Sequence, residues 1–250
     1  DYDNLPNTLK VDKLKDLDII YTHTLYVKQL FDVIGGLDKR LIVVSHNSDV
    51  NIDFSPPDNV IKWFTQNVNI YHDRVEPIPI GLENNRWFPE IRKKEKMLAK
   101  LKEPRQYKNL LYINHNVATN PAKRDGIYEM FEDKPWVTIE RGTNGSNFDS
   151  YLDNIYNHKF VLCPEGNGRD THRRWETMYM GSIPVEIRSA DSLSFWLLPI
   201  LRESKWEDIT EELLLSTSND FDHKHAIMVW GMNQLTFEYW KKKIYYERLS

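Results

Sequence analysis

The stretch FVLCPEGNGRDTHRRWETMYMGSIPV, residues 160–185, decides how the second half of this chain folds. Its apolar run Phe160–Cys163 predicts a buried strand that stops at Pro164. Gly166 and Gly168 then favour a tight loop, because a glycine lets the backbone turn and approach a ligand without a Cβ atom. The pattern therefore predicts a strand, a loop, a short helix and a second strand.

The expected helix of this stretch begins with three basic side chains, those of His172, Arg173 and Arg174. Asp170 or Thr171 is the expected N-cap residue. Cations at a helix N-terminus oppose the helix dipole, so local stability does not explain them. A bound anion does, because the free N–H groups of the first turn and the basic side chains both favour a phosphate. The sequence therefore predicts a phosphate site at this helix start.

Glu176 falls on the same helical stripe as His172 and Arg173, and Trp175 falls on the opposite, packing side. A carboxylate one turn below a phosphate site can accept hydrogen bonds from both hydroxyl groups of a ribose. It can equally pair with His172 or Arg173 on a solvated helix face. The sequence leaves both interpretations open.

The same stretch resembles the donor-binding signature of exostosin-like glycosyltransferases, which runs Pro-x-Gly, Arg-x-x-Glu and Gly-x-Ile-Pro-Val. The matching residues of this chain are Pro164, Gly166, Arg173, Glu176, Gly181, Ile183, Pro184 and Val185. In its short length the chain is similar to compact members encoded by large DNA viruses of algae. The resemblance implies a GT-B-like α/β fold, with two Rossmann-like domains whose parallel sheets face a cleft and a C-terminal helix that crosses back.

The resemblance also implies an activity, the inverting transfer of a hexosyl or pentosyl group from a nucleoside diphosphate sugar to a glycan hydroxyl. It implies that the donor is a UDP-sugar. Two other functions stay open on the same fold. One is a nucleotide-sugar epimerase, which needs no acceptor, and the other is a non-catalytic module that binds a nucleotide sugar or a glycan.

Alternating strand and helix patterns on both sides of a charge-rich segment predict two α/β domains. The charged segment, residues 90–108, is expected to be a solvated helix followed by a linker. We expect an acceptor domain at residues 1–95 and a donor domain at residues 105–220. Residues 225–250, with a long aromatic-rich helix, are expected to pack back on the first domain.

Other elements are expected from apolar patterns and turn residues. The expected strands are 18–23, 41–44, 75–82, 109–114 and 136–140, and a short one around Trp206. The expected helices are 25–34, 125–131, 148–156 and 193–201. Residues 60–71 are expected to hold a helix and a short strand that the sequence does not separate.

Composition limits the partners and the compartment. The 250 residues carry a net charge of −4, which argues against a nucleic-acid binder. Cys163 is the single cysteine, so the chain forms no internal disulfide and fits a reducing compartment. Neither a signal peptide nor an apolar run of membrane-spanning length is visible, so a cytoplasmic protein is expected, in the host cytoplasm if the chain is viral.

Two more basic residues are expected near the sugar donor. Arg124 follows the loop after the first strand of the second half, and it either reaches the diphosphate or lies solvated at an ordinary helix start. Arg141 follows a strand ending at Glu140, and the implied fold places it near the nucleotide base. The chain has no Cys-His pattern for a metal, and we expect no metal or cofactor, with protein cations on the phosphates instead.

An inverting transfer needs a base that takes the proton of the acceptor hydroxyl. The candidates in the first half are His23, His46, Asp49, Asp73 and Glu83. His46 and Asp49 follow a buried strand, where α/β folds place binding groups. We rank Asp49 first because its carboxylate lies farther along the loop, and His46 second because its pKa suits a base near neutral pH. Local turn chemistry is the alternative role of this loop.

Overall fold

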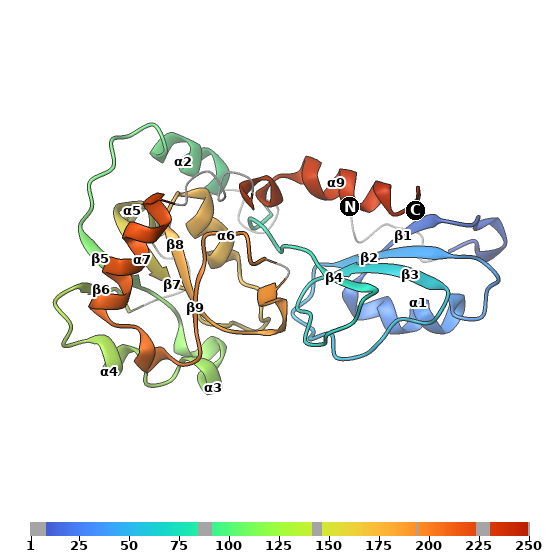
Figure 1. Ribbon diagram of the computed structural model, residues 1–250, viewed down its shortest axis with the longest axis horizontal. Coiled ribbons are helices and arrows are strands. Elements are labelled where there is room, and N and C mark those ends of the chain that lie inside the picture. Colours follow the sequence, from blue (N-terminus) through green and yellow to red (C-terminus); the bar gives the residue numbers. More distant parts are fainter. Residues whose placement is uncertain (1–8, 85–91, 142–146, 194, 224–230, 250) are drawn as a thin grey trace. The chain divides into compact units, whose positions relative to one another are not determined.

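The computed structural model describes residues 9–84, 92–141, 147–193, 195–223 and 231–249 (Figure 1). Its contacts divide the chain into two compact units. The first unit is Asp1–Ile78 with Lys241–Ser250, and the second is Pro79–Trp240. Each unit is built on its own parallel sheet, which confirms the predicted α/β class with two parallel sheets.

The first unit contains a four-stranded sheet in the order β1-β2-β3-β4, and all neighbouring strands are parallel. Its strands are β1 Asp18–His23, β2 Leu41–His46, β3 Val60–Thr65 and β4 Val75–Pro77. Helix α1, Val27–Ile34, packs Val27, Phe31 and Ile34 into the core because these residues recur on one helical face. The core also contains Trp63, which is fully buried.

The expected helix within residues 60–71 is wrong, because Val60–Thr65 is strand β3. Trp63 and Phe64 are adjacent and both fully buried, which a strand covered on both faces allows and a short one-sided helix does not. The expected strand 75–82 is shorter than predicted and ends at Pro77. Pro79 has no N–H to donate to a continuing ladder.

The second unit contains a five-stranded parallel sheet in the order β6-β5-β7-β8-β9. Its strands are β5 Asn109–Ile113, β6 Val137–Ile139, β7 His158–Leu162, β8 Ile183–Ile187 and β9 Leu201–Glu203. The chain builds outward from β5 to β6 and then returns to the other side of β5 with β7. In such sheets a crevice opens where the order reverses, outside the carboxyl ends of the strands, and ligands bind there. The switch point of this sheet therefore lies between β5 and β7.

The helices of the second unit mostly follow the predictions. They are α2 Lys93–Lys100, α3 Pro121–Arg124, α4 Ile127–Phe131, α5 Phe148–Asn157, α6 His172–Tyr179 and α7 Glu211–His223. The sequence β7–α6–β8 confirms the strand, helix and strand expected from residues 160–185. Across the described ranges, no helix has both the length and the apolar character that crossing a bilayer requires.

Three expectations near the C-terminus are wrong. The described residues within 193–201 form no long helix: a 3-10 turn ends at Leu193 and strand β9 begins at Leu201. Trp206 starts a 3-10 turn instead of a strand, and α7 follows without having been predicted, because its Ser, Thr, Asn and Asp residues are weak helix formers. The long helix expected within residues 225–250 is interrupted at Thr236, which is extended, and α9, Phe237–Tyr246, follows it; residues 224–230 lie outside the described part.

The division between the units falls after Ile78, whereas the sequence suggested a boundary at residues 90–108. Helix α2 packs with the second unit, because Met97 enters a core cluster there and Lys96 pairs with Asp149 at 2.8 Å. At the other end of the chain, Lys243 pairs with Glu76 within the first unit. We expected the C-terminal segment to pack on the first domain in this way.

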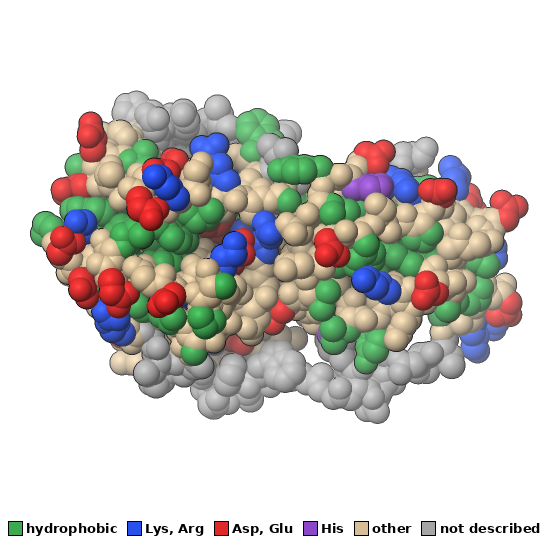
Figure 2. Space-filling model, turned by 90° about the horizontal axis from the view of Figure 1, so that it is seen from below, with side chains coloured by type: hydrophobic (Ala, Val, Ile, Leu, Met, Phe, Trp, Pro, Cys, Tyr) green, Lys and Arg blue, Asp and Glu red, His purple; other side chains and the backbone are tan. Residues whose placement is uncertain are grey.

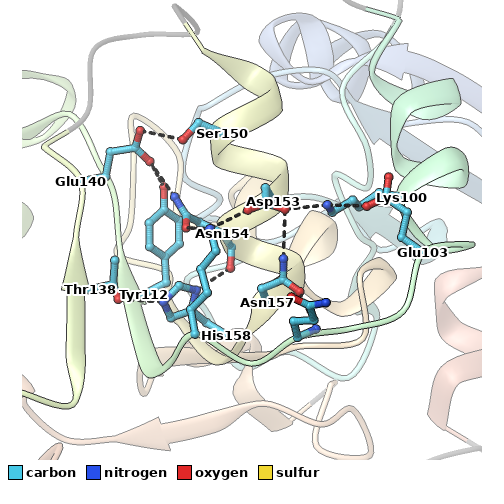
Figure 3. Close-up of polar contacts among 12 residues, drawn as sticks. Lys100, Glu103, Tyr112, Thr138, Glu140, Ser150, Asp153, Asn154, Asn157 and His158 are labelled. Carbon is cyan, nitrogen blue, oxygen red and sulfur yellow. Dashed lines mark hydrogen bonds and ion pairs between the residues drawn. The ribbon is translucent and has the colours of Figure 1, made fainter.

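Polar contacts fix helix α5 against its neighbours (Figure 3). Glu140, just after β6, accepts hydrogen bonds from Tyr112 of β5 and from Ser150 and Asn154 of α5. Asp153 accepts from Lys100 at 2.5 Å, which joins α5 to α2. The helix is therefore held from two sides.

His158, at the start of β7, is buried below the same helix (Figure 3). Its Nδ1 lies 2.7 Å from the carbonyl oxygen of Asn154, and its Nε2 lies 2.8 Å from the hydroxyl of Thr138. A carbonyl only accepts, so Nδ1 carries the proton and Nε2 accepts from the threonine. Burial lowers the pKa of His158, which keeps the ring neutral.

A matched pair of serines tests the polar packing of the second unit. The hydroxyl of Ser182 is buried and bonds the carbonyl oxygens of Ile155 and His158 at 2.7 and 2.8 Å. Ser182→Ala is expected to lower the free energy of unfolding by about 1–3 kcal/mol, because it leaves buried acceptors unsatisfied. Ser216→Ala, which removes an exposed hydroxyl, is expected to change it by less than about 0.5 kcal/mol. Urea unfolding of both variants measures the difference, and equal effects would contradict this packing.

Candidate functional site

Two loops meet at the switch point of the second sheet. The loop after β5 begins at Asn114, and the loop after β7 runs from Cys163 toward Gly168. Arg124 bonds both loops: its Nε donates to the carbonyl oxygen of Glu165 at 2.7 Å and its Nη1 to that of Asn116 at 2.8 Å. One guanidinium group thus fixes the spacing of the two loops.

The expectation for Arg124 left two roles open, and the solvated one is wrong. The side chain is only 8% exposed, and a third contact joins its Nη2 to the carbonyl oxygen of Pro164 at 3.3 Å. Burial, and after it the charge of Arg173, lowers the pKa of Arg124 to about 10, so the group stays charged at neutral pH. In this structure its contacts are carbonyl oxygens, and a contact with a diphosphate stays a prediction.

The backbone φ angles of Gly166 and Gly168 do not explain why these residues are glycines. Neither is among the glycines with positive φ, so the loop does not need glycine for its dihedral angles. Space is the reason at Gly166, because a Cβ atom there would lie 3.2 Å from Nη2 of Arg124. The carbonyl oxygen of Gly166 accepts from Asn120 at 2.7 Å, and its N–H donates to Gly168.

Helix α6 starts beside this loop without a side-chain cap. Thr171 occupies the N-cap position, and its side chain makes no cap hydrogen bond. Asp170 does not cap the helix either, because its carboxylate accepts from the N–H of Ile80 and from the indole of Trp175, both at 2.7 Å. The predicted capping by Asp170 or Thr171 is therefore wrong, and the first turn of α6 keeps the dipole that favours an anion.

The two adjacent arginines of α6 have different environments. Arg174 is buried, donates to Glu186 and lies 3.3 Å from Asp170, so it balances two buried carboxylates. Arg173 is partly exposed, and its guanidinium carbon lies 5.3 Å from the ring centre of Tyr151. Its Nη1 is buried and has no hydrogen-bond partner in the part of the chain that the structure describes. The guanidinium of Arg174 therefore stabilises the folded chain, and that of Arg173 is available to a ligand.

Glu176 and His172 complete the first turns of α6. Glu176 is 6% exposed, so the interpretation as part of a solvated helix face is wrong. Its Oε2 accepts the hydroxyl of Tyr151 at 2.7 Å. His172 lies with its Nδ1 2.7 Å from the carbonyl oxygen of Gly81, which makes Nδ1 the donor and orients the ring.

His115 is a site residue that the sequence analysis did not single out. It lies in the loop after β5, is 1% exposed, and stacks on Tyr128 at 4.3 Å between ring centres. Among the described residues neither ring nitrogen has a hydrogen-bond partner. Burial first, and then the charges of Arg173 and Arg124, lower its pKa to about 4, so the ring is neutral at pH 7. Its position at a strand's carboxyl end was the signal that could have found it.

Arg141 lies at the edge of this region. It is exposed and pairs with Glu129 and Glu132 of the α4 region, each at 3.2 Å. Its guanidinium carbon is 4.8 Å from the ring centre of Tyr128, the residue that also stacks on His115. Its expected place near a nucleotide base stays a prediction.

Three of the candidate bases, His23, His46 and Asp49, lie at or just after the carboxyl ends of β1 and β2. His23 and His46 are register partners on β1 and β2. His23 accepts from the N–H of Leu25 at 3.3 Å, and Asp49 is exposed. The turn chemistry expected for this loop is present, because the hydroxyl of Ser48 accepts from the N–H of Val50 at 3.2 Å.

Two other candidate bases have ionic partners. Asp73 lies 3.2 Å from Nδ1 of His72. Glu83 pairs with Lys93 and belongs to the second unit, not to the first half where the sequence placed it. Over the described residues, no three His, Cys, Asp or Glu side chains are grouped so as to hold a metal ion.

A separate hollow of about 390 Å³ lies in the second unit beside the start of β6. Figure 2 shows that hydrophobic side chains gather on the face of this unit drawn there, with acidic and basic side chains around them. The residues that line the hollow are Met130, Phe131, Lys134, Trp136, Trp206, Glu207, Ile209, Thr210 and Glu211. None of these residues belongs to the two loops at the switch point.

No family model matches the sequence, and no curated protein matches it. Among solved structures, one titled as the crystal structure of a GtfA/B complex is similar to this chain, with a TM-score of 0.45 and 11% identity. The similarity covers 95% of this chain and 59% of that one, so the chain spans about three fifths of the matched structure's length. A similarity this distant does not identify an activity, and the functional argument rests on the site.

The unpaired ring of His115 leads to a stability prediction. His115→Phe is expected to raise the free energy of unfolding at pH 7 by about 1–2 kcal/mol, because it keeps the stack on Tyr128 and removes two unsatisfied nitrogens. The wild-type protein should also lose stability as the pH falls from about 6.5 to about 4. In this range the ring binds a proton in the unfolded chain and stays neutral in the folded one. Since a pKa unit is worth about 1.4 kcal/mol, this loss is on the order of 3 kcal/mol.

Urea unfolding at pH 7, 5.5 and 4.5 checks both parts of this prediction. The two proteins share every other titrating group, His158 included, so only His115 separates their pH slopes. Parallel slopes for the wild type and His115→Phe would show that the ring is not buried in its neutral form.

Proposed function

We propose that the protein is a glycosyltransferase that moves a hexosyl or pentosyl group from a nucleoside diphosphate sugar to a hydroxyl group of a glycan. The observation that carries the proposal is the environment of Arg173. This charged side chain lies in the first turn of an uncapped helix, at the switch point of a parallel sheet, with a buried Nη1 that no described residue satisfies. Phosphate is the ligand that such a site favours.

The donor would bind along α6. Its diphosphate would contact Arg173 and His172 at the helix N-terminus, with the loop of Gly166 and Gly168 close to the phosphates. Its ribose would lie one turn farther along, at Glu176, where a buried carboxylate can accept hydrogen bonds from hydroxyl groups. The resemblance of residues 160–185 to exostosin-like enzymes supports this assignment and a UDP-linked donor.

Transfer would proceed with inversion and without a metal ion. The guanidinium of Arg173 and the dipole of α6 would stabilise the charge that develops on the leaving diphosphate, which is the role a metal has in other transferases. The expected acceptor domain, residues 1–95, would supply the base. Asp49 is the preferred base because its carboxylate is exposed at the carboxyl edge of the sheet, and His46 is the second candidate.

Substituting the two adjacent arginines separates binding from folding. Arg173→Ala is expected to weaken the binding of UDP by about 2–3 kcal/mol, the value of a lost charged hydrogen bond, with little change in stability. Arg174→Ala is expected to lower the free energy of unfolding by about 3–5 kcal/mol, because the buried carboxylates of Asp170 and Glu186 would lose this cation, and Glu186 would keep Arg202 at 3.7 Å. Calorimetry with UDP and urea unfolding measure the two effects. A folded Arg173→Ala protein with wild-type affinity for UDP would place the nucleotide elsewhere.

The base is tested by removing basicity without changing shape. Asp49→Asn is expected to reduce turnover by on the order of 10²–10⁴, with the affinity for UDP-sugar nearly unchanged. The assay runs in excess EDTA, with His46→Ala in parallel. Near wild-type turnover of Asp49→Asn together with inactive His46→Ala would make His46 the base. Activity that EDTA abolishes and Mn²⁺ restores would replace the metal-free mechanism.

If the protein were a non-catalytic binding module, Asp49→Asn and His46→Ala would behave like the wild type and no sugar would be transferred. A rival epimerase predicts conversion of the nucleotide sugar in the absence of any glycan. Analysis of the sugar released from the nucleotide, with and without acceptor, separates the three functions.

A further inference from the structure

One aromatic residue of α5 contacts both ligand-facing side chains of α6. The hydroxyl of Tyr151 donates to Oε2 of Glu176 at 2.7 Å. Its ring centre lies 5.3 Å from the guanidinium carbon of Arg173, within the range of a cation–π interaction. Arg173 and Glu176 are three positions apart on the helix, so Tyr151 spans the distance between the proposed phosphate and ribose contacts.

The hydrogen bond between Tyr151 and Glu176 has a fixed direction. Burial, and after it the charge of Glu176, raises the pKa of Tyr151 well above its ordinary value. The phenol therefore stays protonated and is the donor of the hydrogen bond. The bond uses Oε2 of the carboxylate. No described residue donates to Oε1 of Glu176, which leaves that oxygen to a ligand hydroxyl.

The support below Tyr151 is rigid. Helix α5 is held to β5 and β6 through Glu140 and to α2 through Asp153 (Figure 3). A side chain on such a support can hold its neighbours within the small tolerance that recognition requires. Helix α6 has only eight residues and no side-chain cap, so its own backbone gives less support to Glu176.

We propose that Tyr151 is the positioning residue that makes this site selective for a ribonucleotide over a deoxyribonucleotide. Its hydroxyl orients Glu176 toward the ribose hydroxyls, and its ring holds the guanidinium of Arg173 at the phosphates. The inference rests on the proposed function, because it takes the ligand to be a nucleoside diphosphate. A ligand without the 2′-hydroxyl would leave an oriented, buried carboxylate oxygen without a donor, which costs affinity.

The experiment compares three probes, UDP, 2′-deoxy-UDP and inorganic pyrophosphate, by calorimetry. The wild-type protein is expected to bind UDP about 10- to 100-fold more tightly than 2′-deoxy-UDP, the range for a hydrogen bond to a charged group. Tyr151→Phe keeps the ring and loses the hydroxyl, so this ratio is expected to fall about 10-fold while pyrophosphate binding stays the same. Tyr151→Leu also loses the ring, so it is expected to bind pyrophosphate a few-fold more weakly as well.

Tyr156→Phe is the matched control. Tyr156 lies on the same helix, and its hydroxyl donates to the carbonyl oxygen of Glu103 at 2.7 Å, away from α6. This variant is expected to keep the wild-type ratio of the two nucleotides. Glu176→Gln is expected to lower the ratio as Tyr151→Phe does, and the double variant should add nothing further, because both changes remove one interaction.

Each outcome has a distinct meaning. A wild-type ratio in folded Tyr151→Phe, or an equal loss for all three probes, overturns the positioning role and leaves the proposed transferase intact. A wild-type protein that binds neither nucleotide overturns the proposed function together with this inference. A reduced ratio with unchanged pyrophosphate affinity supports the inference.

Discussion

The buried guanidinium of Arg124 holds together the two loops on which the candidate site is built. Removing such a charge from water costs on the order of several kcal/mol unless hydrogen bonds replace the lost hydration. Here the replacement comes from backbone carbonyls of Asn116, Pro164 and Glu165, which belong to both sides of the switch point. The spacing of the loops and the close approach at Gly166 depend on this side chain, and Asn120 adds one hydrogen bond between the same loops.

Local pattern predicted the part of the fold that local forces determine. The apolar run before Pro164, the helix after the glycines and the following strand have the expected order, because burial and turn chemistry act within a few residues. Residues 60–65 were misassigned because a short apolar run has no clear period, and only the neighbouring strands β2 and β4 make it a strand. Similarly, α7 depends on packing of Leu214 more than on propensity.

The sequence analysis placed the candidate site at the start of α6, and the contacts of the folded chain changed several roles that it gave to individual residues. Charge at the start of α6 pointed to Arg173, and the structure agrees that this residue has an unsatisfied nitrogen. Sequence reasoning gave Asp170 a capping role, because it cannot show that Ile80, ninety positions away, presents an N–H to that carboxylate. His115 and Tyr151 were missed for the same reason: stacking and burial are properties of the folded chain.

The neutrality of His115 has a consequence for product release in the proposed transferase. A protonated His115 would be a third cation at the switch point. It would bind the free nucleoside diphosphate as tightly as the leaving group, and binding that is equal in both states does not accelerate the chemical step. It would instead lengthen the stay of the spent nucleotide, and departure of product often limits turnover. Because burial lowers the pKa of His115 to about 4, its neutral ring would add no charge that slows release of the product nucleotide in the proposed transferase.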